Sequence, residues 1–151
     1  MRENNKRHHW LGIKDIVDLN QWQKIQDNFA AITGVCLRSV DLQGNAITTP
    51  SNEPQICNEL TSNSIAIKKI CSKCLPTFLG GTSVIDKNLS FTCLPGVHNF
   101  LAPLKLNIKD EALGYLIVGP VILVMRRPKE DYLKVAEELE LDPDYLWNSI
   151  L

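Results

Sequence analysis

The sequence predicts an α+β domain in which an antiparallel sheet of about five strands is flanked by N- and C-terminal helices. Three observations carry this prediction. A helical repeat of apolar residues occupies positions 15–32, short apolar runs separated by turn residues fill most of positions 35–124, and a second helical repeat follows Pro128. Strands joined by short turns and bracketed by helices are typical of antiparallel α+β architecture.

Size and composition limit the classes of protein that need to be considered. The chain has 151 residues, which is one ordinary domain, and its 44% hydrophobic and 22% charged residues are typical of globular proteins. The net charge is −1, so the basic excess that supplies most non-specific affinity for nucleic acid is missing. We therefore expect no direct contact between this domain and nucleic acid.

No segment is predicted to enter a membrane. The longest apolar run, residues 112–125, has 14 residues and contains two glycines and a proline, whereas a membrane-spanning helix needs about 20 residues. We interpret this run as a buried strand. Because the first ten residues are polar and lack an apolar signal segment, we expect a cytoplasmic protein with no membrane partner.

The N-terminal part of the chain is predicted to hold a leader and a helix. Residues 1–12 are predicted to be a flexible leader. From Asp15 to Ile32 the apolar residues recur every three or four positions, which draws one stripe along an amphipathic helix that Gly34 ends as a C-cap. The stripe consists of Ile16, Leu19, Trp22, Ile25, Phe29 and Ile32.

A hairpin and a second helix are predicted next. Strands at residues 35–41 and 46–49 flank a turn in which Gly44 and Asn45 both tolerate positive φ angles. After the two prolines at positions 50 and 54, the sequence favours a helix from about Gln55 to Lys69.

The second half is predicted to complete the sheet and to end in helices. Three further strands are predicted at Leu89–Cys93, Phe100–Leu106 and Leu113–Val124. Pro128 begins a helix and Asp142 a second, shorter one. We treat residues 126–151 as C-terminal helices that cover the sheet, form a homodimer or connect to an effector, so the domain proper is residues 13–125.

Four of the five cysteines form a cluster in the sequence. Cys57, Cys71, Cys74 and Cys93 lie within 37 residues. The two thiolates of Cys71-Ser-Lys-Cys74 can bind one cation because a tight turn brings both sulfurs to one side, with Cys57 and Cys93 as the natural third and fourth ligands. The gaps of 13 and 18 residues before and after this pair are longer than those of a zinc ribbon.

Three hypotheses remain open for this cluster. The leading one is structural zinc in a closed tetrahedral site. The same thiolates can hold an iron-sulfur cluster, which would make the domain a redox or oxygen sensor. In the third, the thiols bind no metal and line a pocket or form a redox-labile bridge. Cys36 lies in an apolar strand and is expected to serve packing.

Short motifs follow one another along most of the chain. They are the segment 19–35, Asp41-Leu-Gln-Gly44, Ile47-Thr-Thr-Pro50-Ser51-Asn52, the four cysteines, Cys93-x-x-Gly96, Phe100-x-x-Pro103-Leu104 and Leu113-Gly114-x-x-x-x-Gly119-Pro120. In order and approximate spacing these motifs resemble the PocR sensory domain family over about residues 13 to 125.

The resemblance implies a sensory module with a PAS-like fold. Such modules are normally attached to an effector, which is a transcription regulator, a histidine kinase or a cyclic-nucleotide signalling domain. The implied ligand is a small hydrocarbon derivative such as a short alcohol or diol. We therefore expect a sensory ligand-binding domain of a prokaryotic signal-transduction protein or transcription regulator.

Six residues are candidates for contact with the ligand. Ser51 and Asn52 follow the second predicted strand, where their side chains suit either a helix N-cap or a hydrogen bond to a ligand hydroxyl. Three aromatic residues lie on predicted strands, where a sensor would hold a small apolar pocket between sheet and helices. They are Phe91, Phe100 and Tyr115. His98 lies near Cys93 and suits either a ligand or the metal.

Catalysis has little support in the sequence. There is no Gly-rich phosphate loop, nucleophile elbow or zinc-hydrolase helix motif. The pair Cys71 and Cys74 follows a predicted helix, whereas a thioredoxin-like enzyme places such a pair after a strand and at a helix start. We expect a protein that is not an enzyme.

Overall fold

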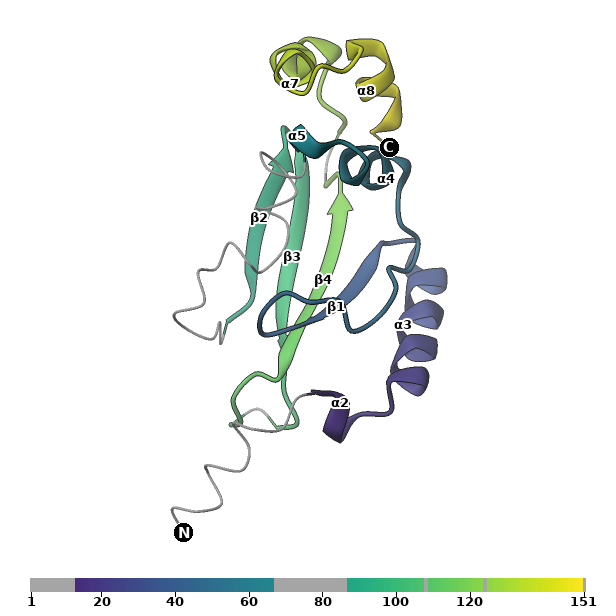
Figure 1. Cartoon of the computed structure of the whole chain (residues 1–151), viewed down its shortest axis with the longest axis vertical. Coiled ribbons are helices and arrows are strands. Elements are labelled where there is room, and N and C mark those ends of the chain that lie inside the picture. Colours follow the sequence, from purple (N-terminus) through teal and green to yellow (C-terminus); the bar gives the residue numbers. More distant parts are fainter. Residues whose placement is uncertain (1–12, 67–86, 108, 124, 151) are drawn as a thin grey trace.

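Four antiparallel strands form one sheet in the order β1-β4-β3-β2, with helices along one edge and across one end (Figure 1). This arrangement comes from a computed structural model that describes residues 13–66, 87–107, 109–123 and 125–150. The α+β class is confirmed, whereas the expected count of about five strands is wrong, since the described sheet has four. The predicted leader, Cys71 and Cys74 lie outside the described residues.

The strands agree with the sequence patterns to within a few residues. Their bounds are Leu37–Asp41 for β1, Leu89–Leu94 for β2, Val97–Leu104 for β3 and Gly114–Val121 for β4. A tight turn with Gly96 at φ 72° joins β2 to β3, and a longer connection lies between the end of β3 at Leu104 and the start of β4 at Gly114.

Short helices account for most of the remaining described residues. Their bounds are Ile13–Ile16 for α2, Leu19–Thr33 for α3, Gln55–Thr61 for α4, Ser64–Ala66 for α5, Lys129–Tyr132 for the 3-10 helix η3, Leu133–Glu138 for α7 and Pro143–Ser149 for α8. Among the described residues no helix is long and apolar enough to cross a membrane.

Capping groups set both ends of α3. The Asp18 carboxylate accepts hydrogen bonds from the backbone amides of Asn20 and Gln21, at 3.0 and 3.3 Å, so the helix starts at Leu19 rather than at Asp15. At the other end, Gly34 has φ 71° and donates to the Ala30 carbonyl at 2.8 Å, which confirms the predicted C-cap.

The side of α3 that faces the sheet is not the apolar stripe of the sequence. Gln26 and Ala30 are the buried residues of this helix. The apolar residues Ile25, Phe29 and Ile32 are instead 57%, 57% and 84% exposed. These three residues of the predicted stripe do not pack on the sheet, because the surface below α3 is a row of polar groups.

The amide of Gln26 satisfies that row of polar groups. Its Oε1 accepts from the hydroxyls of Ser39 and Thr48, at 2.8 and 2.7 Å. Its Nε2 donates to the Leu37 carbonyl, the Thr49 carbonyl and the Ser51 hydroxyl, at 3.2, 3.0 and 2.9 Å. The indole of Trp22 adds a bond to the Ser39 hydroxyl at 2.8 Å. Helix α3, strand β1 and residues 48–51 are thus joined by one buried network.

The same network explains why residues 46–49 do not form the predicted strand. This segment lies beside β1 but forms only isolated bridges, Val40 with Ala46 and Leu37 with Ser51. Between these bridges the Ser39 amide donates to the Thr48 hydroxyl at 3.0 Å and not to a backbone carbonyl. A side chain has replaced a ladder hydrogen bond, so the predicted hairpin does not continue as a regular strand.

Two clusters of buried apolar side chains stabilise the fold. One lies on the sheet and consists of Val40, Leu101, Ala112, Tyr115 and Ile117. The other joins α4 and α5 to the end of the β2–β3 hairpin and to the C-terminal helices, and it includes Ile56, Leu60, Leu94, Val97, Tyr132, Leu139, Leu146 and Ile150. The helices after residue 128 therefore pack on the domain (Figure 1).

We expect Gln26→Leu to lower the free energy of unfolding by about 3 kcal/mol or more, because three hydroxyl groups and two carbonyls lose a buried partner. Denaturant unfolding followed by circular dichroism measures the loss. The control is Gln21→Leu, at an exposed position of the same helix, for which a change within about 0.5 kcal/mol is expected. Equal losses in the two variants would contradict the role given to the network.

Candidate functional site

A pocket of about 310 Å³ lies where the ends of α3 and β4 meet α4 and the C-terminus. Small-molecule sites in proteins begin at about this size. Most of its lining is apolar, and one amide side chain contributes to it. The lining residues are Gly34, Val35, Cys36, Asn52, Pro54, Ile56, Val97, Pro120, Val121, Ile122 and Ile150.

Asn52 is the predicted ligand-contacting residue that lines this pocket. It has φ 54°, a left-handed conformation that asparagine tolerates better than most residues. Its Nδ2 donates to the Ala30 carbonyl at 2.7 Å and to the Val35 carbonyl at 3.4 Å. The amide therefore ties the loop before α4 to the end of α3 and fixes one wall of the pocket.

Ser51 lies beside Asn52 but belongs to the network below α3. It is buried, accepts from Gln26 and donates to the Asp27 carboxylate at 2.6 Å. This hydrogen bond, followed by one from Gln23, lowers the pKa of Asp27 below its ordinary value of 3.8. The alternative that Ser51 or Asn52 caps the next helix is wrong, because the N-cap residue of α4 is Pro54.

The other four candidates divide between the two faces of the sheet. Phe91 pairs with Asn99, and Tyr115 lies two residues from Ile117, which pairs with Leu101. Because directly paired residues share a face, Phe91 and Tyr115 lie on the face of the sheet cluster. His98 and Phe100 alternate with Asn99 and Leu101 along β3, so they lie on the opposite face. The six candidates thus do not form one site.

Asn99 is a buried polar residue that the sequence analysis missed. Its Nδ2 lies 3.4 Å from the Cys93 sulfur, at a bulge of β2. Gly119 makes room for it, since a Cβ at that glycine would lie 2.8 Å from both the Asn99 Oδ1 and the His98 carbonyl oxygen. Alternation with the apolar Val97 and Leu101 is the signal that could have placed Asn99 on the buried face.

The two described cysteines of the predicted metal site pack on the same core. Cys57 on α4 and Cys93 on β2 are both half-buried against the cluster that joins α4 to the C-terminal helices. Among residues 13–66, 87–107, 109–123 and 125–150, no group of three metal-ligating side chains gathers. The other two predicted ligands, Cys71 and Cys74, lie outside those ranges.

Contacts with Arg126 hold the end of α8 beside the pocket. The Arg126 guanidinium donates to the carbonyls of Trp147 and Ile150, at 3.3 and 2.9 Å, and lies 3.5 Å from the centre of the Trp147 ring. Ile150 itself lines the pocket. Tyr145 also lies on α8, and its hydrogen bond with Glu59 of α4 raises the pKa of Tyr145.

Comparison with known proteins gives one family. A family model described as "Sensory domain found in PocR" matches residues 15–150. The match includes the C-terminal helices as well as the sheet. No curated protein and no solved structure gives a significant match.

We expect Gly119→Ala to lower the free energy of unfolding by about 2–4 kcal/mol, since φ is 131° and the added Cβ would contact Asn99 and the His98 backbone. Gly34→Ala is the matched control. It also has positive φ, at 71°, but nothing lies within 4 Å of the added atom, so a cost of about 1 kcal/mol is expected. Denaturant midpoints compare the two, and similar losses would argue against tight packing around Asn99.

Proposed function

The chain belongs to the family of sensory domains found in PocR, and we propose that it binds a small, mostly apolar molecule in the pocket between α3, α4, the end of β4 and Ile150. The observation that carries the proposal is the combination of an apolar lining with a single amide in a pocket of about 310 Å³. Such a lining favours a ligand that is largely hydrocarbon with one polar group.

Asn52 supplies the polar contact in this proposal. Its Nδ2 is already engaged with Ala30 and Val35, and no donor from the described part of the chain reaches its Oδ1. A ligand hydroxyl can donate to that oxygen while the hydrocarbon part displaces water from the apolar walls. Short alcohols and diols have this chemistry. A ligand of a few heavy atoms gains at most about 1.5 kcal/mol per atom, so we expect micromolar or weaker affinity.

In this proposal the bound ligand produces a signal, and no chemical reaction takes place in the pocket. The pocket lining offers one amide and one thiol, Cys36, as its polar side chains, which suits binding rather than catalysis. Because Ile150 is a wall of the pocket, a ligand that contacts it changes the surroundings of the end of α8. We propose that an effector domain or signalling partner, such as a transcription regulator, responds to this change.

We further propose that Cys57, Cys71, Cys74 and Cys93 hold a structural zinc ion. Two features of the described residues fit it. Cys57 and Cys93 come from distant parts of the sequence and pack on one core cluster. The Asn99 amide donates toward the Cys93 sulfur at 3.4 Å, and such an N–H group stabilises a negatively charged thiolate. When bound, zinc would supply a cross-link between α4 and the sheet. An iron-sulfur cluster on the same thiolates is the alternative.

We expect alcohols or diols of three to eight carbons to raise the melting temperature of the chain, and Val35→Trp to abolish the shift by filling the pocket. Thermal-shift scans and isothermal calorimetry over a panel of alcohols, diols, aldehydes and short acids measure this. Leu106→Trp adds the same side chain at an exposed position outside the pocket and should leave the response unchanged.

Two results would contradict the ligand hypothesis. One is a panel in which no compound stabilises the wild-type chain. The other is stabilisation that survives Val35→Trp, which would place the ligand elsewhere in the domain.

We expect one zinc per chain by elemental analysis, a colourless protein, and loss of both metal and thermal stability in Cys93→Ser. Cys36→Ser is the matched control, since Cys36 is buried but outside the predicted ligand set, and it should keep its zinc. A brown protein that contains iron would favour the iron-sulfur alternative. Absence of any metal, with melting unaffected by a chelator, would refute both metal hypotheses.

A further inference from the structure

Helix α3 carries an apolar stripe that the fold does not use. Three residues of the predicted stripe stay exposed and form this unused stripe. They are Ile25, Phe29 and Ile32, which are 57%, 57% and 84% exposed. Their spacing of four and then three residues places them on one line along the helix. The buried contacts of α3 come from Gln26 and Ala30 instead. We propose that this stripe binds the same stripe of a second copy, with the two α3 helices antiparallel.

The area of the stripe is consistent with a dimer. Three large side chains exposed to this extent present roughly 400 Å² of apolar surface, a size at which patches begin to mark interaction sites. Two copies together bury about 800 Å² of apolar surface. With the usual polar rim the total comes to about 1,300 Å², which lies at the lower end of specific interfaces. Interfaces at this end of the size range are typically weak, so we expect a reversible monomer–dimer equilibrium.

The stripe is self-complementary when the helices run in opposite directions. A twofold axis near Phe29 places each Phe29 against its symmetry mate and each Ile25 against Ile32 of the other copy, because the two isoleucines are about equally far from Phe29. Large apolar residues then meet along the whole contact. Because both copies use the same surface for the contact, no surface of this kind is left for a third copy, and the assembly stops at two.

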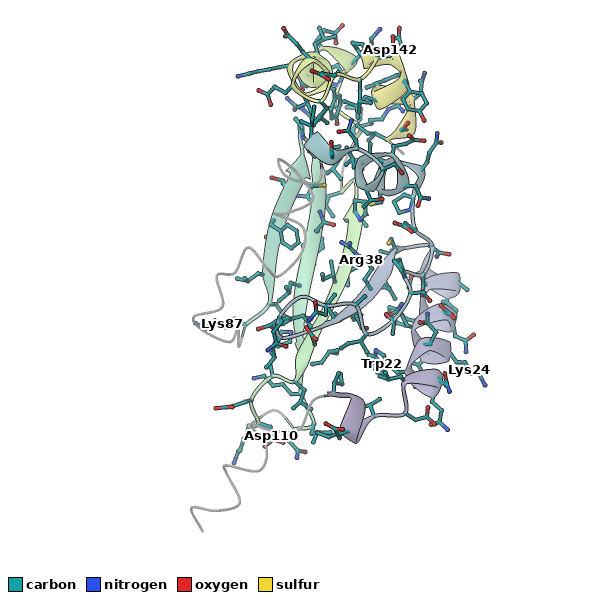
Figure 2. All side chains as sticks on the ribbon, in the orientation of Figure 1. Trp22, Lys24, Arg38, Lys87, Asp110 and Asp142 are labelled. Carbon is teal, nitrogen blue, oxygen red and sulfur yellow. The ribbon has the colours of Figure 1, made fainter. Side chains whose placement is uncertain are left out.

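Charge selects the antiparallel arrangement over the parallel one. Figure 2 shows Trp22 on the side of α3 toward the sheet and Lys24 pointing away from it. In a parallel pair the twofold axis would place the two Lys24 side chains on opposite flanks of the contact and far from either helix C-terminus. In the antiparallel pair each lies near the last turn of the other α3, which has no basic residue of its own and carries the negative end of the helix dipole.

Sedimentation velocity of the full chain from about 1 to 300 μM tests the proposal. We expect a monomer–dimer equilibrium, and we expect Phe29→Glu to raise the dissociation constant at least about 100-fold because each dimer buries two such carboxylates. The exposed position of Phe29 keeps the fold intact, which circular dichroism checks. Leu123→Glu makes the same apolar-to-acid change at a position that is 59% exposed and outside α3, so it should change the constant less than about threefold.

Lys24→Gln tests the orientation. Loss of the contact with the helix C-terminus should weaken an antiparallel dimer about two- to fivefold, whereas a parallel dimer should be unchanged. The proposal is overturned if the wild-type chain stays monomeric over the whole range, if Phe29→Glu leaves the dimer unchanged, if Leu123→Glu disrupts it equally, or if Lys24→Gln does not weaken it. None of these results depends on a ligand, so they do not bear on the pocket.

Discussion

The buried amide of Gln26 holds together the three segments from which the N-terminal half of the domain is built. It bonds to β1 through Leu37 and Ser39, and to the following segment through Thr48, Thr49 and Ser51. A buried amide that lost these partners would be costly, so α3 has one stable position against the sheet. Asn52, the next residue along, then reaches the end of α3 and forms one wall of the pocket.

This polar contact also decides what the surface of the domain looks like. Because hydroxyls and carbonyls lie below α3, an apolar residue in place of Gln26 would leave them unsatisfied, and the apolar residues of the helix take other directions. Segment 46–51 covers the outer edge of β1 with side-chain bonds and isolated bridges. An edge covered in this way is a poor template for another strand, so the association that we propose is expected at α3 rather than at β1.

The features that were predicted from the sequence depend on neighbouring residues. Gly34 ends α3, Gly44 has φ 88° in the predicted turn, and Asp142 caps α8 by a local hydrogen bond. The features that were not predicted depend on residues that are distant in the sequence. The partners of Gln26 lie 11 to 25 residues away, and Asn99 fits only because Gly119 lies across the β3–β4 pairing.

The candidate site also depends on residues that are distant in the sequence. Of the six candidate ligand contacts, Asn52 lines the pocket, and the other lining residues come from strands, helices and loops that are distant in the sequence. Residue types alone do not reveal that Val35, Pro120 and Ile150 line one pocket. The aromatic residues are ambiguous for a further reason. Alternation places Phe91 and Phe100 on opposite faces, yet both faces of this sheet carry apolar residues, so polarity does not tell them apart.

The position of Ile150 sets a limit on how such a sensor can signal. A ligand shifts a conformational equilibrium only by the difference between its affinities for the two states, so it must contact a group that moves. In the proposed output that group is Ile150, the C-cap residue of α8, whose carbonyl accepts from Arg126 at 2.9 Å. Moving Ile150 away from the pocket would break this bond and the stacking of Arg126 on Trp147, so both contacts would oppose the change. A ligand with micromolar or weaker affinity supplies at most about 8 kcal/mol, and only the difference in its affinity for the two states acts on the equilibrium, so the Arg126 contacts must be weak enough to lie within that difference.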